Sequence, residues 1–234
     1  MAKLSDFVSG NQKHQKFTSS GTWTHPKPGD VIHLAYRMAG GGAGGGNATG
    51  TALTVGGGGG EIREGVIAVT SDVTVDIGAG GAGGATGSGN VGGTGGDTVL
   101  NNASRALGGG RRINILNGPE DAHNVSHSIG GGFENTSGPI YDGKSSQGGR
   151  GGESDQNNAR RRRGTSTFWA RGGNESGQNN GAGGGASLGD GGNAGNSTDG
   201  AAGNGVDGGG GGGSNDDVGG SDGGNGAVEL FWVE

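Results

Sequence analysis

The sequence predicts a mostly β and irregular fold with almost no α-helix. It combines a small antiparallel β platform, built from both ends of the chain, with a polyglycine-II helix bundle that carries inserted loops. Glycine accounts for 66 of the 234 residues, against an ordinary share of about 7%. Short segments near both ends alternate apolar and polar side chains, whereas the glycine-rich middle repeats with a period of three.

The chain has little apolar material for a conventional core. Leu, Ile, Val and Phe total 35 residues, a composition typical of low-complexity chains. The four prolines exclude collagen, and the absence of cysteine excludes disulfides and cysteine-based zinc sites. No stretch of 18 apolar residues occurs and no apolar segment follows Met1, so we expect neither a transmembrane span nor a secretory signal.

The concentrated apolar residues fall into five segments that are typical of strands in one antiparallel sheet or sandwich. In one of them alternation places Leu34 and Tyr36 on one face and Arg37 on the other. We expect a hairpin at the Ser71-Asp72 step, and we expect the C-terminal strand to pair with the N-terminal ones. The β segments cover about 17–38, 61–77 and 227–233.

The segment 78–226 is interpreted as the polyglycine-II bundle with its loops. Glycine recurs at every third position from Gly78 to Gly96, with Asn90 in the one missing place, and a second row lies in a neighbouring frame. A period of three is that of an extended left-handed helix of the polyproline-II type, which has no internal hydrogen bonds. Such helices would pair their backbone N–H and C=O groups with those of neighbouring helices. The alternative is a flexible glycine linker.

Residues 1–16 are predicted to be a leader, either flexible or serving as a docking peptide through Phe7 and Val8. Residues 17–234 form the glycine-rich domain. The formal charge along the chain is uneven: residues 1–104 sum to −1, residues 105–171 to +4 and residues 172–234 to −9. This charge distribution, with a basic middle segment and an acidic last segment, is informative about the surface of the protein and not about its fold.

Several segments in this order resemble the glycine-rich domain of tailed-bacteriophage tail-fibre and tail-tip adhesins. They are Phe-Thr-Ser-Ser-Gly-Thr-Trp-Thr at 17–24, the glycine tract at 40–46, the strand and tract at 73–84, and the final glycines and strand at 223–232. The resemblance covers about residues 17–234. It implies a polyglycine-II bundle whose loops contact a bacterial surface receptor, either an outer-membrane protein or lipopolysaccharide. Those adhesins often carry a substantial N-terminal attachment domain, whereas about sixteen residues precede the first strand here. The chain would therefore attach through a short peptide, or belong to another part of the virion.

Three inserts with ordinary side chains, at 111–129, 133–147 and 153–171, are expected to be loops at the tip of the bundle, where function usually resides. Their arginines can bind phosphates or carboxylates bidentately, and their aromatic residues can anchor a contact. The alternatives to receptor contact are that the arginines lie in solvated basic loops and that the aromatic residues form small hydrophobic clusters within the loops. The candidate receptor-binding residues are Arg111, Arg112, Phe133, Tyr141, Arg160, Arg161, Arg162, Arg163, Phe168 and Trp169.

Catalysis has little support, because no nucleophile elbow and no phosphate-binding loop is present. We expect no enzyme, no cofactor and no metal site. The aspartates at 190, 199, 207, 216, 217 and 222 do not keep the nonapeptide spacing of calcium-binding repeats, and solvated bundle surface is the better interpretation. The sequence pI near 5.3 speaks against a nucleic-acid partner.

The sequence therefore predicts a virion protein, folded in the host cytoplasm, that recognises a bacterial surface receptor. Its partners would be that receptor and other virion proteins, and it could be a homo-oligomer. The alternative is a structural or decorating protein of the capsid, tail or baseplate. An ice-binding protein is the least favoured interpretation, because charged and aromatic inserts would interrupt a flat binding face.

Overall fold

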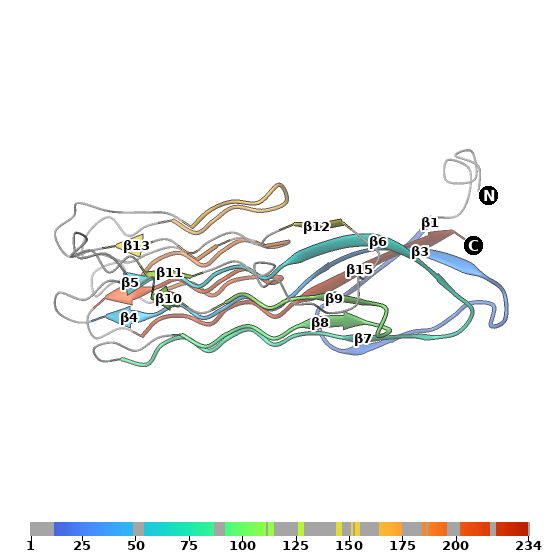
Figure 1. Ribbon diagram of the computed structural model, residues 1–234, viewed down its shortest axis with the longest axis horizontal. Coiled ribbons are helices and arrows are strands. Elements are labelled where there is room, and N and C mark those ends of the chain that lie inside the picture. The colour runs from blue at the N-terminus through green and yellow to red at the C-terminus, as the bar shows by residue number, and fades with distance from the viewer. Residues whose placement is uncertain are drawn as a thin grey trace.

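The computed structural model describes residues 12–48, 54–86, 92–110, 112–114, 126–128, 144–146, 151, 153–154, 164–174, 184–185, 187–195, 202–215 and 219–233. The molecule is elongated: a β sandwich at one end holds the first and last strands, and glycine-rich runs extend from it (Figure 1). This part of the chain contains no helix, and so none that is long and apolar enough to cross a membrane. The predicted fold class is confirmed.

Two antiparallel sheets form the platform. The larger has the order β1-β15-β3-β6-β12 and joins the strands Gln12–Phe17, Ala227–Val233, Ile32–Ala39, Ile62–Val69 and Lys144–Ser146. The smaller has the order β2-β7-β8-β9 and joins Gly21–Trp23, Val73–Asp76, Thr98–Leu100 and Ser104–Ala106. The last strand pairs with the N-terminal strands as predicted, since β15 lies between β1 and β3.

The hydrophobic core lies between the two sheets. Leu34 and Tyr36 of β3 are buried, as the alternation predicts, and Val73 and Val75 of β7 meet them from the other sheet. The Tyr36 hydroxyl and Ser104 Oγ share a hydrogen bond of 2.9 Å that links β3 to β9 across this core. The buried cluster consists of Trp23, Leu34, Tyr36, Met38, Val69, Val73, Val75, Leu100, Ala106, Val228 and Leu230.

The expected hairpin at Ser71-Asp72 is wrong. β6 belongs to the larger sheet and β7 to the smaller one, so the chain crosses between the sheets here instead of reversing within one. Val69 and Val73 are both buried, and they face the same core from opposite sides. Alternation alone does not distinguish such a crossing from a hairpin, because both keep the apolar side chains inward.

Other boundaries also differ from the sequence analysis. The first strand begins at Gln12 within the expected leader, and its side chains are exposed or half-buried, so no alternation marks it. β8, β9 and β12 come from the segment assigned to the bundle and its loops. The β8–β9 turn has positive φ at Asn101 (49°) and Asn102 (53°), and its closing bond runs from Ala103 N–H to Leu100 O at 2.9 Å. Asparagine tolerates this mirror-image turn, which suits the twist of a hairpin.

The run 40–46 lies at the centre of the glycine bundle and is hydrogen-bonded to six neighbouring runs. Its N–H groups donate with a period of three, at 2.8 to 3.0 Å: residues 40 and 43 to the run 56–61, residues 41 and 44 to 92–97, and residues 42 and 45 to 219–226. Its carbonyls accept bonds from three further runs, at 78–84, 107–110 and 208–214. Six neighbours therefore surround one run, as the period-three pattern of the sequence requires.

Close approach of the backbones explains why these runs consist of glycine. A Cβ at Gly44 would lie within 3.0 Å of three backbone atoms, the carbonyl C and O of Ala82 and the O of Gly81. Real Cβ atoms essentially never come so close to other heavy atoms. The space between runs is filled by peptide groups instead of side chains, which explains how a chain with few large apolar residues becomes ordered.

At the edges of the bundle, side-chain oxygens take the place of a missing neighbouring run. Two pairs of backbone N–H groups donate to Asx side chains, with a spacing of three residues on both partners. The bonds are Gly80 to Asn225 Oδ1 (2.9 Å), Gly83 to Asp222 Oδ1 (2.7 Å), Arg171 to Asp190 Oδ1 (2.8 Å) and Asn174 to Asn193 Oδ1 (2.9 Å). Two of the aspartates that the sequence analysis assigns to solvated surface thus complete the backbone bonding of the bundle.

Short strand pairs lie at the end of the bundle opposite the platform (Figure 1). Three pairs are formed: β10 (Arg112–Asn114) with β11 (Ser126–Ser128), β13 (Glu153–Ser154) with β5 (Thr54–Val55), and β14 (Ser214–Asn215) with β4 (Asn47–Ala48). The first two are antiparallel and the third is parallel.

Candidate binding surface

The predicted site residues are distributed unevenly over the structure. Phe168 and Trp169 are described with their side chains, and Arg112 lies in β10, opposite Ser128 at the far end. The remaining candidates lie outside the described residues; they are Phe7, Val8, Arg111, Phe133, Tyr141, Arg160, Arg161, Arg162 and Arg163.

A tight turn between two polyglycine runs presents Phe168 and Trp169. Thr167 organises this turn, because its Oγ1 accepts from the backbone N–H groups of Trp169 and Ala170, both at 3.2 Å, and donates to the carbonyl of Ser187 at 2.7 Å. The turn is closed by the Thr167 N–H, which donates to the Ala170 carbonyl at 3.0 Å. Both aromatic side chains are thus carried on an ordered backbone.

The two aromatic rings are packed edge to face and project outward. Their centroids are 4.8 Å apart with an interplanar angle of 84°. Phe168 is 90% exposed and Trp169 is 36% exposed. The guanidinium carbon of Arg37 lies 3.8 Å from the centroid of the Trp169 ring, in the geometry of a cation–π contact.

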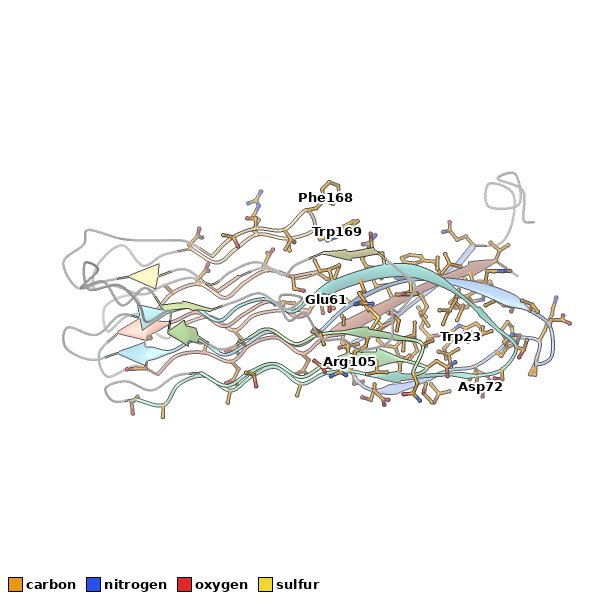
Figure 2. The ribbon with its side chains drawn as sticks, in the orientation of Figure 1. Trp23, Glu61, Asp72, Arg105, Phe168 and Trp169 are labelled. Atoms are coloured by element: carbon orange, nitrogen blue, oxygen red, sulfur yellow. The ribbon has the colours of Figure 1, made fainter. Side chains whose placement is uncertain are left out.

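This contact corrects the expected position of the third insert. Arg37 belongs to β3, so the turn with Phe168 and Trp169 lies against the platform and not at the tip of the bundle (Figure 2). The physical reason is the path of the chain. β13 already lies at the far end, so the following run returns along the bundle and reverses next to the sandwich.

Arg37 also joins two carboxylates on the outer face of the larger sheet. In the register of β15, β3 and β6, Glu229, Arg37 and Glu64 form one cross-strand row. Arg37 Nε donates to Glu64 Oε1 at 3.1 Å, and Nη1 donates to Glu229 Oε2 at 3.5 Å. All three side chains are partly exposed, so these pairs add little stability. They do fix the guanidinium beneath Trp169.

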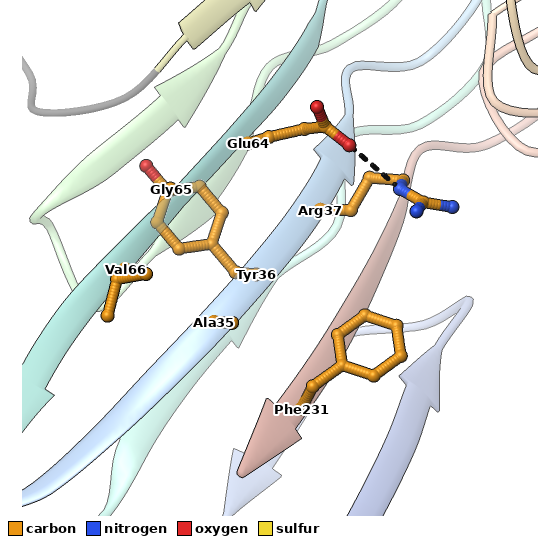
Figure 3. A pocket seen from close by; sticks show the side chains of 7 residues that line it. All are labelled: Ala35, Tyr36, Arg37, Glu64, Gly65, Val66 and Phe231. Carbon is orange, nitrogen blue, oxygen red and sulfur yellow. Dashed lines mark hydrogen bonds and ion pairs between the residues drawn. The ribbon is translucent and has the colours of Figure 1, made fainter. Parts of the chain in front are cut away.

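A shallow hollow of about 580 Å³ lies beside this row (Figure 3). Its lining consists of Ala35, Tyr36, Arg37, Glu64, Gly65, Val66 and Phe231. On the outer face the small Ala35 lies in register between Phe231 and Val66, which leaves a depression between taller neighbours. His14 of β1 stacks on Phe231, with centroids 4.7 Å apart and an interplanar angle of 22°.

Sequence reasoning placed Arg37 on the outer face but did not recognise Arg37, Glu64 and Phe231 as parts of one surface. They come from three strands that are far apart in the chain, and nothing in a single sequence specifies the register that aligns them. Within the described ranges, no group of three His, Asp or Glu side chains is arranged to hold a metal ion.

The fold and this surface define the class: a glycine-rich protein in which a β-sandwich platform carries a polyglycine bundle. The model of the family described as a glycine-rich domain matches residues 18–232, so the chain belongs to that family. A search of curated proteins found no match to this sequence.

Proposed function

We propose that this chain is a tail-fibre or tail-tip protein of a bacteriophage that binds a receptor on the bacterial surface without catalysing a reaction. The support for its origin is the resemblance of segments 17–24, 40–46, 73–84 and 223–232 to phage adhesin domains. Membership of the glycine-rich domain family is compatible with this origin. The receptor would be an outer-membrane protein or lipopolysaccharide.

The observation that carries the proposal is the bonding of the central polyglycine run 40–46 to six neighbouring runs. The polyglycine runs are fixed by backbone hydrogen bonds to neighbouring runs, and the run 164–174, which follows the segment 155–163, is bonded in this way. Segments held at both ends lose less freedom on binding than a free peptide, which lowers the entropic cost of recognition. The chain can therefore vary its connecting segments without altering the scaffold.

The basic segment 155–163 is the first choice for the receptor contact. It connects β13, at the end opposite the platform, to the run that begins at Gly164, and it contains four consecutive arginines, 160–163. Arginine binds carboxylates and phosphates through two parallel hydrogen bonds, so both receptor classes offer suitable partners.

The experiment is binding of the fluorescently labelled protein to a panel of bacterial strains. One variant has residues 155–163 replaced by a Gly-Ser segment of equal length, and the matched control has the same replacement at 175–183, which contains no arginine. Both exchanges leave the Thr167 turn intact. We expect strain-selective binding that the first exchange abolishes and the second preserves.

Two outcomes contradict the proposal. Absence of binding to every strain, together with the protein appearing on the capsid or tail tube of a virion, would favour the alternative of a structural or decorating protein. Equal binding by both variants and the unaltered chain would remove the segment 155–163 from the receptor site.

A further inference from the structure

We propose that the hollow on the outer face of the larger sheet binds a neutral saccharide. Its volume of about 580 Å³ lies within the range of about 300–1,000 Å³ that is usual for small-molecule sites. The inference goes beyond the proposed function, because it depends on none of the segments that connect the polyglycine runs.

One wall of the hollow is apolar and flat. His14 covers one side of the Phe231 ring, so the ring is held in place where it borders the hollow. Val66, which is 56% exposed, stands on the opposite side of Ala35 (Figure 3). The C–H groups on one face of a pyranose ring pack well on such a surface, because they carry partial positive charge toward the negative face of an aromatic ring.

The other wall offers both donors and acceptors. Arg37 has five N–H groups, and two of its nitrogens donate to Glu64 and Glu229. These two bonds use Nε and Nη1 of Arg37, Oε1 of Glu64 and Oε2 of Glu229. A sugar hydroxyl both donates and accepts, so adjacent hydroxyls can use the guanidinium and the carboxylate together.

The pairing of charges on this wall favours a neutral ligand. Arg37 lies between two carboxylates, Glu64 and Glu229, and the register places Lys16 opposite Glu229 and Lys144 opposite Glu64, so the row alternates in sign. A phosphorylated sugar would find the Arg37 guanidinium already paired with both carboxylates, whereas neutral hydroxyls bring no charge that needs a partner. Phe168, 90% exposed and in contact with Trp169 above Arg37, extends the aromatic surface beyond the hollow.

Saturation-transfer NMR on the intact chain tests this inference. The probes are the methyl glycosides of glucose, galactose, mannose and N-acetylglucosamine, with glucose 6-phosphate as the charged comparison. Two variants alter the hollow: Ala35→Leu fills its floor, and Phe231→Leu replaces the flat ring by an aliphatic side chain. The control is Val31→Ala, which truncates a side chain that is 61% exposed and does not line the hollow.

We expect at least one neutral glycoside to receive saturation from the unaltered protein and glucose 6-phosphate to receive less. Ala35→Leu should abolish the transfer, Phe231→Leu should weaken affinity by roughly threefold to tenfold, as loss of a stacking contact does, and Val31→Ala should change neither. Thermal unfolding verifies that each variant is folded, and Phe231→Leu carries the test if Ala35→Leu is not.

Three results would overturn the inference: no transfer to any neutral glycoside, transfer that persists in the folded hollow variants, or tighter binding of the phosphorylated sugar. None of them depends on whether the protein adheres to bacteria, so the two proposals can fail separately.

Discussion

Two single substitutions at adjacent positions, Gly95→Ala and Gly96→Ala, test the packing of the bundle directly. Gly95 and Gly96 occupy the same run, and neither has the positive φ that disfavours alanine. A Cβ at Gly95 would lie within 3.0 Å of three backbone atoms of residues 41–42, whereas the nearest atom to a Cβ at Gly96 is the nitrogen of Ala79 at 3.1 Å. The entropic effect of the exchange on the unfolded chain is the same at both positions, so the difference in stability isolates the steric term.

The cost at Gly95 follows from the bonds that must lengthen. Ordinary contact begins at 3.4 Å, so even the farthest of the three atoms, the oxygen of Gly42 at 2.9 Å, must move by 0.5 Å, and the oxygen of Gly41 must move farther. That shift strains the bonds from Gly41 N–H to the Gly96 carbonyl (2.9 Å) and from Gly109 N–H to the Gly41 carbonyl (2.7 Å). Overpacking with two weakened buried bonds costs about 3 kcal/mol. At Gly96 a shift of a few tenths of an ångström is roughly offset by the entropic gain, leaving a change within about 1 kcal/mol.

Thermal unfolding followed by circular dichroism or calorimetry measures both variants. We expect Gly95→Ala to lower Tm by roughly 6–12 °C and Gly96→Ala to change it by no more than about 4 °C, given about 2–4 °C per kcal/mol for a chain of this length. Equal losses at the two positions, or no loss at Gly95, would refute the tight packing of these runs.

Two further predictions concern the edge of the bundle and the platform. Asp222→Ala should deprive the Gly83 N–H of its side-chain acceptor and lower the free energy of unfolding by about 0.5–1.5 kcal/mol. Asp222→Asn keeps an oxygen acceptor and should leave the stability nearly unchanged. Amide hydrogen exchange at Gly83 measures the difference, and equal protection in both variants would contradict this prediction. Gly65→Ala should destabilise the sandwich by about 2 kcal/mol, because a Cβ there would collide with the Tyr36 side chain. It should cost more than Ser104→Ala, which removes one hydrogen bond of the Tyr36 hydroxyl. Denaturant unfolding that ranks the two variants the other way would refute this.

Local patterns in the sequence predicted the elements that each segment forms by itself. Alternation identified β3 and β7 with the correct inward faces, because each strand has the core on one side and solvent on the other, so that buried and more exposed side chains alternate along most of it. The period of three identified the polyglycine runs, because a helix with three residues per turn meets the same neighbouring run at every third residue, where close approach requires glycine. Both signals are contained within a few consecutive residues.

The features that the sequence did not predict depend on contacts between distant segments. β1 is an edge strand with polar, exposed side chains, so nothing in its own composition distinguishes it from a leader. The position of Phe168 and Trp169 follows from the packing of the run 164–174 along the bundle and of Trp169 on Arg37, which no local pattern encodes. The hollow requires the register of three strands at once, and that register appears only when the sheet is assembled.

The acidic character of the last segment has an explanation within the scaffold. A polyglycine run needs neighbours in three directions, so a run at the edge of the bundle leaves one row of N–H groups without a backbone acceptor. Asp190 and Asp222 supply such acceptors, and Asn193 and Asn225, each three residues farther along the chain, supply the next ones. An aspartate also adds a negative charge to an exposed edge, and like charges oppose the stacking of two bundles edge to edge, as they do at the edges of β-sheets. Two of the nine acidic residues of the segment 172–234, Asp190 and Asp222, are thereby bonded within the fold, whereas the proposed receptor contact lies in the arginine-rich segment 155–163.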